Sequence, residues 1–330
     1  MCSMACPRSG SGPPPAVIIT KGCCTVAATT GTRPNVELER VNVRAASRTA
    51  VLVCQGRAAA HDRIAPGRFD DPTAVRMLTD AERVPVEQVR SGVAPRTASE
   101  RVNFEMVRAC GELMAPRTIA IDDAIRDRPT AQLVVLGAGL DGRAWRMKDL
   151  AAIDTFEVDR PASQADKRRR VAALESVARS IRFVPVDFGT DDFDAALETA
   201  GHEGSETTTW VWEGVVPYLT AAEVEATVRV VRGRSASGSR LIVNYQMPSF
   251  TAVIGRLFAR GLRLLTRQPD PLADEPRRSS WTPETMAALL QRHGFAVTRD
   301  DDLVSIARHE GIAVNHTHSL GVSRVAIADC

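Results

Sequence analysis

Short apolar runs alternate with amphipathic stretches along the second half of the chain. Such runs, each ending at a polar residue or a glycine, are typical of strands buried on both faces of a parallel sheet. We expect strands at 133–136, 153–158, 182–186, 208–212, 240–245, 295–298 and 322–328. Helical patterns lie between them, at about 161–179, 191–200 and 221–232, and again in the segment that follows Trp281. The alternation predicts an α/β fold with a mostly parallel, doubly wound sheet.

The first 130 residues have a different pattern. Residues 1–36 are rich in Gly, Pro, Ser, Thr and Cys without a period, so we expect a disordered N-terminal extension. Residues 37–130 read as an N-terminal helical cap. Within it, Asp71 and Pro72 suggest the start of a helix, and a long helix at 98–126 should be kinked or split at Pro116.

We therefore expect one domain at 37–330, made of the cap at 37–130 and a core at 131–330. Within the core, residues 250–266 carry one apolar and one arginine-rich helical stripe. These stripes fit a surface helix with a solvated basic face, or a lid at about 250–280 over an apolar or acidic substrate.

Composition excludes several classes of protein. The 330 residues are 44% hydrophobic and 25% charged, with a net charge of +2, so no basic excess points to nucleic acid. No apolar run is long enough for a membrane helix, and the N-terminus lacks the order of a signal peptide. The seven cysteines form no C-x-x-C pair, which argues against a zinc site and for a reduced, cytoplasmic protein. The sequence does not determine the oligomeric state.

The strand at 133–136 enters a turn with the spacing G-x-G-x-x-G, from Gly137 through Gly139 to Gly142. Ligands of open parallel sheets bind at this end of a strand, where glycines let the backbone approach them closely. Asp159 ends the next strand, at the place where an acid holds the two hydroxyls of a ribose. The pair of features indicates a nucleoside ligand, without saying which.

The charges beside the turn leave the choice of nucleoside open. Asp141 would repel a pyrophosphate but would tolerate the ammonium and sulfonium groups of S-adenosylmethionine, or it caps the following helix. Arg143 and Arg146 would suit phosphates.

Four longer motifs carry a family resemblance: LGAGLDGRAWRM, FEVDRPASQADKRRR, FVPVDF and WVWEGVVPYLT. Together they resemble the leucine carboxyl methyltransferase-like family, above all its actinobacterial branch of S-adenosylmethionine-dependent methyltransferases. The likeness covers about 45–328 and includes SRTAVLVCQGRAAAHD, FDDPTAVRML and SWTPETMAALLQRHGF. It implies a Rossmann-like class I methyltransferase fold, with S-adenosyl-L-methionine as cofactor.

The resemblance also implies the cofactor-binding residues, which are Gly137, Ala138, Gly139, Asp159, Asp187, Phe188, Glu213, Arg117 and Arg48. Gly137 would pack against the methionine end and Asp159 would hold the ribose. Asp187 and Phe188 would flank the adenine, and Glu213 would lie near the amino group.

Two basic residues complete the implied site. Arg117 would hold the methionine carboxylate, although its distance from the turn differs from the pattern of the eukaryotic members. Arg48 is the nearest match to a basic residue that the family has near its N-terminal helix. The first 40 or so residues have no counterpart in the family.

The methyl acceptor is harder to infer, because cofactor motifs say nothing about it. No grouping of residues reads as a general base, which favours a carboxylate or an acidic phenol. Tyr218 and Tyr245 could orient an acceptor oxygen, or simply pack beside the sheet. His316 and His318 could bind a metal ion if they lay on a strand, but a polar loop is the simpler interpretation, and we expect no metal.

The sequence thus predicts an S-adenosylmethionine-dependent methyltransferase that methylates a carboxylate or hydroxyl oxygen of a small molecule. An NAD(P)-dependent oxidoreductase, from the literal glycine spacing, and a non-catalytic protein that only binds the cofactor are the alternatives.

Overall fold

The computed structural model describes residues 47–248 and 277–330. The expected extension at 1–36 lies outside the described residues, as does most of the expected lid at 250–280. Seven strands form one sheet: β1 (Gln132–Leu136), β2 (Asp154–Asp159), β3 (Ser180–Pro185), β4 (Thr208–Trp212), β5 (Arg240–Gln246), β6 (Ala296–Asp302) and β7 (Ser323–Asp329). All seven expected strands are confirmed, most within two residues of the expected ends.

The order of the strands is β3-β2-β1-β4-β5-β7-β6. The first five pair in parallel, and β7 is antiparallel to both β5 and β6. The chain runs outward from β1 to β3 and then returns to the other side of β1 with β4. The adjacent carboxyl ends of β1 and β4 are therefore a topological switch point, where ligands of doubly wound sheets bind.

Helices cover both faces of the sheet, as expected for a doubly wound fold. On one face, Leu133 and Val135 of β1 belong to a core cluster shared with α1 (Arg48–Ala60), α3 (Ala98–Asp127) and α10 (Leu303–His309). On the other face, Val134 and Leu136 belong to a cluster shared with α6 (Phe193–Thr199), α7 (Ala221–Gly233) and α9 (Pro283–Arg292). Alternate residues of one strand thus build two cores.

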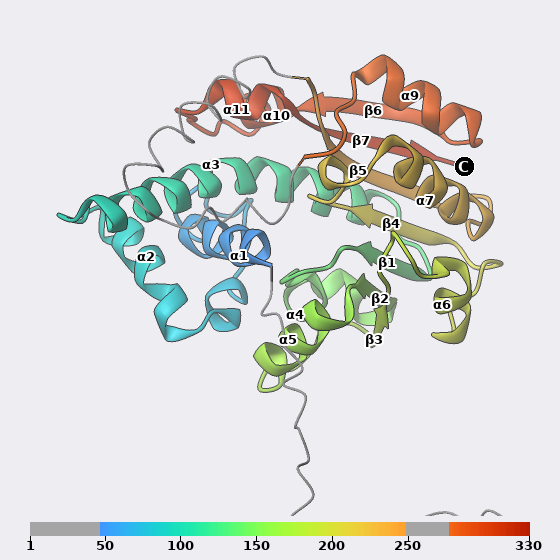
Figure 1. The fold of residues 1–330 in the computed structure, drawn as a ribbon, viewed down its shortest axis with the longest axis horizontal. Helices are drawn as coiled ribbons and strands as arrows, with labels where there is room; N and C mark the ends of the chain where they lie inside the picture. The colour runs from blue at the N-terminus through green and yellow to red at the C-terminus, as the bar shows by residue number, and fades with distance from the viewer. Residues whose placement is uncertain (1–46, 249–276) are drawn as a thin grey trace, which may run out of the picture. The chain divides into compact units, whose positions relative to one another are not determined.

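The cap consists of α1, the 3₁₀ turn η1 (Ala74–Met77), α2 (Asp80–Ser91) and α3, and Figure 1 shows α1 and α2 gathered against α3. The expected helix start at Asp71 is wrong. Asp71 precedes only η1, and α2 begins at Asp80 behind Thr79, which forms a capping box with Glu82. Oδ1 of Asp71 does accept the amide of Ala74, the first residue of η1, at 3.0 Å, and Oδ2 lies 2.9 Å from Nε of the buried Arg57, so that the carboxylate joins this turn to α1.

Pro116 does not split the long helix, because α3 runs without a break from Ala98 to Asp127. The helix α5 (Pro161–Val171) ends earlier than expected, since the amides of Val177 and Ala178 turn back to the carbonyl of Ala144. Four short elements were not expected as separate elements: α4 (Arg143–Arg146), η2 (Lys148–Ala152), η3 (Val216–Tyr218) and α11 (Thr317–Gly321).

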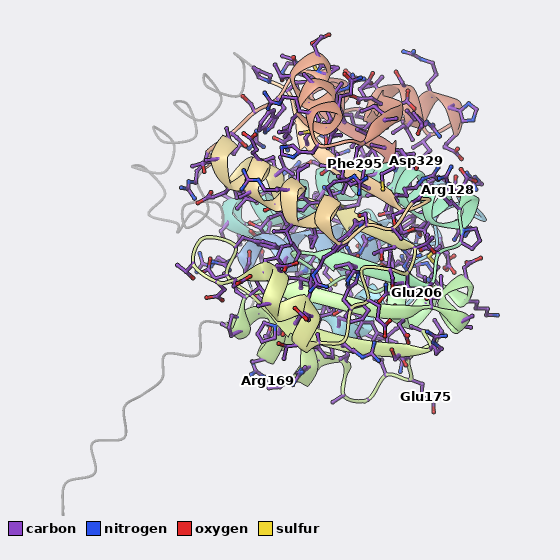
Figure 2. The ribbon with its side chains drawn as sticks, turned by 90° about the vertical axis from the view of Figure 1, so that its right-hand side faces the viewer. Arg128, Arg169, Glu175, Glu206, Phe295 and Asp329 are labelled. Atoms are coloured by element: carbon purple, nitrogen blue, oxygen red, sulfur yellow. The ribbon has the colours of Figure 1, made fainter. Side chains whose placement is uncertain are left out.

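Ion pairs fasten α3 to the end of the sheet. Figure 2 labels Arg128, just after α3, close to Asp329 at the end of β7, and their side chains approach to 3.1 Å. Arg240 of β5 binds the same carboxylate at 2.7 Å.

Among the described helices, none is long and apolar enough to cross a membrane. The cysteines of the described part, Cys54, Cys110 and Cys330, are free thiols.

Candidate functional site

A cavity of about 500 Å³ opens at the carboxyl ends of the central strands. Its walls come from α1, from Arg117 of α3, from the turn after β1, and from the segments that follow β2, β3 and β4. Arg278, near the start of the second described range, also lines the cavity. The switch point of the sheet thus holds a cavity large enough for a small ligand.

Gly137 and Gly139 shape the turn at the floor of this cavity. Both have positive φ, +66° and +44°, a conformation that other residues rarely adopt. A Cβ on Gly137 would lie 2.2 Å from Cγ2 of Val215, and one on Gly139 would lie 3.2 Å from Cβ of Ala50. The amides of Gly137 and Ala138 both donate to the carbonyl of Val158. These glycines therefore let neighbouring segments close tightly around the turn.

Gly142, the third glycine of the spacing, has a different role. A Cβ there would lie 2.2 Å from Oγ1 of Thr73, which belongs to the cap. The helix that follows, α4, has only four residues, and its first amide, on Arg143, donates to the carboxylate of Asp141 at 2.7 Å. A carboxylate therefore occupies the place where a dinucleotide fold presents a helix end to pyrophosphate.

Asp159 faces the cavity from the end of β2. Its Oδ2 accepts a hydrogen bond from the amide of Gly139 at 2.6 Å, and its Oδ1 accepts one from the amide of Arg160 at 2.7 Å. Burial raises the pKa of this carboxyl, against the lowering effect of the two amides. Each oxygen keeps further acceptor capacity, as recognition of two neighbouring hydroxyls requires.

The segment after β3 supplies Asp187 and Phe188, and both line the cavity. Oδ1 of Asp187 accepts a hydrogen bond from the amide of Gly189 at 3.0 Å. The ring of Phe188 packs edge-on against Phe193 with centroids 5.4 Å apart. An acid and an aromatic ring thus flank this end of the cavity.

Glu213, directly after β4, pairs with two arginines at the cavity wall. Its Oε1 lies 2.7 Å from Nε of Arg117, and its Oε2 lies 2.9 Å from Nη1 of Arg143. Burial raises the pKa of this carboxyl, but Arg117 and Arg143 outweigh burial and lower it to about 2. Asp141, which contacts Arg143, also has a lowered pKa despite its burial. Both acids are ionised at neutral pH.

The basic residue that α1 presents to the cavity is Arg57 rather than Arg48. Arg48 is exposed at the first position of α1 and is absent from the cavity lining, whereas Arg57 lines it and is 5% exposed. Its Nη2 donates to the carbonyl of Leu140, and its Nε lies 2.9 Å from Asp71. Arg57 was missed, although its spacing three residues after the apolar Cys54 was a signal that it shares the buried face of α1.

The two tyrosines lie in different surroundings. Tyr218 lines the cavity, whereas Tyr245 belongs to the core, where its hydroxyl donates to Asp300 at 2.6 Å. His316 and His318 lie at and within the short helix α11, so the argument from alternate residues of a strand does not apply. Nδ1 of His316 lies 2.9 Å from Glu112.

Comparison with known proteins gives one family and one fold. Residues 50–232 match the family model described as leucine carboxyl methyltransferase. A Frankia alni protein named as a presumed S-adenosyl-L-methionine-dependent methyltransferase is 34% identical over 197 residues, which are 58% of this chain and 66% of that protein. A protein of the same name from Mycobacterium sp. strain JLS is 31% identical over 208 residues, with coverage of 63% and 68%. The matches thus span about two thirds of the length of these relatives.

Among solved structures, a presumed methyltransferase from Thermobifida fusca superposes on 89% of this chain and 98% of its own. The TM-score is 0.51 at 13% sequence identity, which shows a shared fold.

Proposed function

This chain belongs to the leucine carboxyl methyltransferase family and has a Rossmann-like class I methyltransferase fold, and on this premise we propose that it is an S-adenosylmethionine-dependent O-methyltransferase acting on a small molecule. The observation that carries the proposal is the cavity at the switch point, where Asp159 and the ionised Glu213 face the same space. When bound, S-adenosylmethionine supplies a methyl group already activated by a sulfonium.

The described side chains fit this cofactor. Both oxygens of Asp159 are held by backbone amides and suit a ribose diol. The carboxylates of Asp141 and Glu213 suit the ammonium group, and Arg117 suits the carboxylate. Asp187 and Phe188, held by the turn after β3, suit the adenine, with Gly137, Ala138 and Gly139 forming the floor. Arg57 replaces Arg48 as the basic residue that we propose from α1.

A carboxylate or acidic hydroxyl is the acceptor that this lining favours. Among the described residues that line the cavity, there is no histidine, lysine or cysteine to act as a base. Of the acids, Asp141, Glu213 and Glu223 pair with arginines, and we assign Asp159 and Asp187 to the cofactor. A carboxylate acceptor is already anionic, so the protein needs only to orient it and exclude water. Of the two tyrosines, Tyr218 is the one that lines the cavity, and we propose it as the residue that orients such an oxygen.

The literal glycine spacing gives little support to an NAD(P)-dependent oxidoreductase. The carboxylate of Asp141 accepts the first amide of α4, where a pyrophosphate would bind. Gly142 accommodates Thr73 of the cap instead of a ligand. We also propose a small-molecule acceptor and a cytoplasmic location.

Isothermal titration with S-adenosylmethionine, S-adenosylhomocysteine and NADPH tests the cofactor. We expect micromolar binding of the first two, none of NADPH, and loss of binding in Asp159→Ala. The matched control is Asp154→Ala, at the other end of β2, where the acid pairs with Arg179 outside the cavity. Binding of NADPH alone, or equal binding by both variants, would refute the proposal.

Transfer of a labelled methyl group from S-adenosylmethionine to a panel of acids and phenols tests the acceptor. Methyl esters release methanol in base, whereas aryl methyl ethers do not, so the product identifies the acceptor oxygen. Tight cofactor binding without transfer to any member of a broad panel would favour the non-catalytic alternative.

A further inference from the structure

A buried network of charged side chains from the cap, the turn after β1, α4 and the segment after β4 forms part of the cavity wall and extends behind it. It consists of four arginines and four acids, with side chains at most 8% exposed: Arg57, Arg117, Arg143, Arg146, Asp71, Asp122, Asp141 and Glu213. Opposite charges are equal in number, so removal of any one member leaves an unpaired buried charge.

Arg143 is the member that connects three elements. Its Nε lies 2.7 Å from Asp122 of α3, and its Nη1 lies 2.9 Å from Glu213 after β4 and also contacts Asp141 of the turn. Its own amide donates to Asp141. Asp141 and Glu213 line the cavity, whereas Arg143 and Asp122 do not. Arg143 therefore acts on the cavity only through these two carboxylates.

We propose that Arg143 is a positioning residue that orients the carboxylates of Asp141 and Glu213 toward the amino group of the bound cofactor. This inference rests on the proposed function. The first arginine of GRAWRM thereby contributes to ligand binding without contact with the ligand.

Electrostatics gives the reason. The groups that face Glu213 are Arg117 of α3, Arg143 of α4, Arg57 of α1 and the like charge of Asp141. Burial favours the neutral form of Glu213, and the pair Arg117 and Arg143 overcomes it. Since we propose that Arg117 also binds the cofactor carboxylate, Arg143 is the cation that keeps Glu213 ionised once Arg117 is shared. A guanidinium can bind several acids in fixed directions, which an ammonium cannot.

Arg146 provides a matched control. It lies in the same short helix, its side chain is 6% exposed against 3% for Arg143, and its Nη2 binds the same acid, Asp122, at 2.7 Å. Its other partner is Asp71 at 3.7 Å, and neither acid lines the cavity. If breaking the buried network is enough to weaken ligand binding, substitution of either arginine should weaken it. If binding depends on the positioning of Asp141 and Glu213, only substitution of Arg143 should weaken it.

The test is the Kd of S-adenosylhomocysteine between pH 5 and pH 8, measured by calorimetry on the full chain, beside a thermal melt. We expect Arg143→Gln to bind about tenfold more weakly at pH 7.5. We expect a further loss toward pH 5 that wild type and Arg146→Gln do not show, because Glu213 is protonated more easily. Arg146→Gln should have a lower Tm than wild type, but its Kd should stay within about threefold of the wild-type value.

A folded Arg143→Gln with the Kd and pH profile of Arg146→Gln would overturn the positioning role. If Arg143→Gln does not fold, Arg143→Lys replaces it, because lysine keeps the charge but lacks the planar guanidinium with its several donors. Weaker ligand binding by Arg143→Lys than by Arg146→Lys supports the proposal, and equal binding refutes it. Failure of the wild-type chain to bind S-adenosylhomocysteine is a separate outcome, which refutes the proposed function itself.

Discussion

Gly142→Ala tests the conclusion that the third glycine of the turn admits the cap rather than a pyrophosphate. A Cβ at this position would lie 2.2 Å from Oγ1 of Thr73 and 3.2 Å from Oδ1 of Asp71. The backbone itself is not strained, because φ is −105°. The substitution must therefore displace the Thr73 hydroxyl, which donates to Asp71 at 2.7 Å, or shift the backbone.

The magnitude follows from these contacts. Displacing the hydroxyl loses a hydrogen bond to a charged group, at about 2 kcal/mol, whereas shifting the backbone incurs an overpacking cost of about 1–3 kcal/mol. Because either response relieves the contact, we expect Gly142→Ala to lower the free energy of unfolding by about 1–3 kcal/mol. Thr73→Ala alone should cost about 2 kcal/mol. The double variant should cost little more than Thr73→Ala, because the new Cβ then meets Cβ of residue 73 at 3.5 Å, an ordinary contact, and Oδ1 of Asp71 at 3.2 Å, a tight contact that a shift of a few tenths of an ångström relieves.

Urea unfolding of the four proteins gives the coupling free energy. We expect the two changes to be non-additive by about 2 kcal/mol. Gly233→Ala is the control, because a Cβ at this last residue of α7 would meet nothing within 4 Å and should be neutral or slightly stabilising. Additivity within about 0.5 kcal/mol would show that Gly142 and Thr73 do not compete for space, and would refute the reasoning.

Three further outcomes are expected. Gly137→Ala should lower the free energy of unfolding by about 2–4 kcal/mol, because φ is positive there and the new Cβ clashes with Val215. Adding Val215→Ala should restore part of that free energy in urea unfolding, and no recovery would contradict the clash. Burial and Arg234 lower the pKa of His202 to about 4, below its value of about 6.5 in the unfolded chain. Between these two pH values the unfolded chain binds one more proton than the folded chain, so the free energy of unfolding should fall by up to about 3 kcal/mol as the pH drops from about 6.5 to about 4. His202→Gln should flatten that part of the pH–stability curve, and an unchanged slope would exclude His202 as its source. Tyr245→Phe removes the hydrogen bond to Asp300 and should lower the free energy of unfolding by about 1–2 kcal/mol, while the Kd of S-adenosylhomocysteine stays unchanged. A tenfold higher Kd would show that Tyr245 contributes to ligand binding.

The sequence by itself determined the features that depend on neighbouring residues. Apolar runs placed the central strands, because a strand buried on both faces needs a continuous apolar segment. The edge strand β6 has the polar sequence AVTRDDD and was predicted to end at residue 298, whereas it continues to Asp302. The glycine turn and Asp159 were predicted together, since the carboxyl ends of neighbouring parallel strands meet at one edge of the sheet. The structure indeed joins them directly through the amide of Gly139.

Local signals were misleading where a distant residue competed for the same group. Asp71 reads as the cap of an α-helix, and its Oδ1 does accept the amide of Ala74, but only a 3₁₀ turn follows it, and its Oδ2 pairs with Arg57, fourteen positions earlier. Pro116 reads as a break, yet α3 continues through it. The role of Gly142 could not be read from its spacing, because the atom that it accommodates belongs to Thr73.

The partners of the buried charges were decided only by the tertiary structure. Arg117 and Glu213 are 96 residues apart, and Arg143 and Glu213 are 70 apart, and no periodicity relates such positions. The choice of Arg57 over Arg48 at the cavity depended on which face of α1 packs against the turn. A chain can encode a strand or a turn locally, but the energy of a buried charge depends on every group that the fold brings around it.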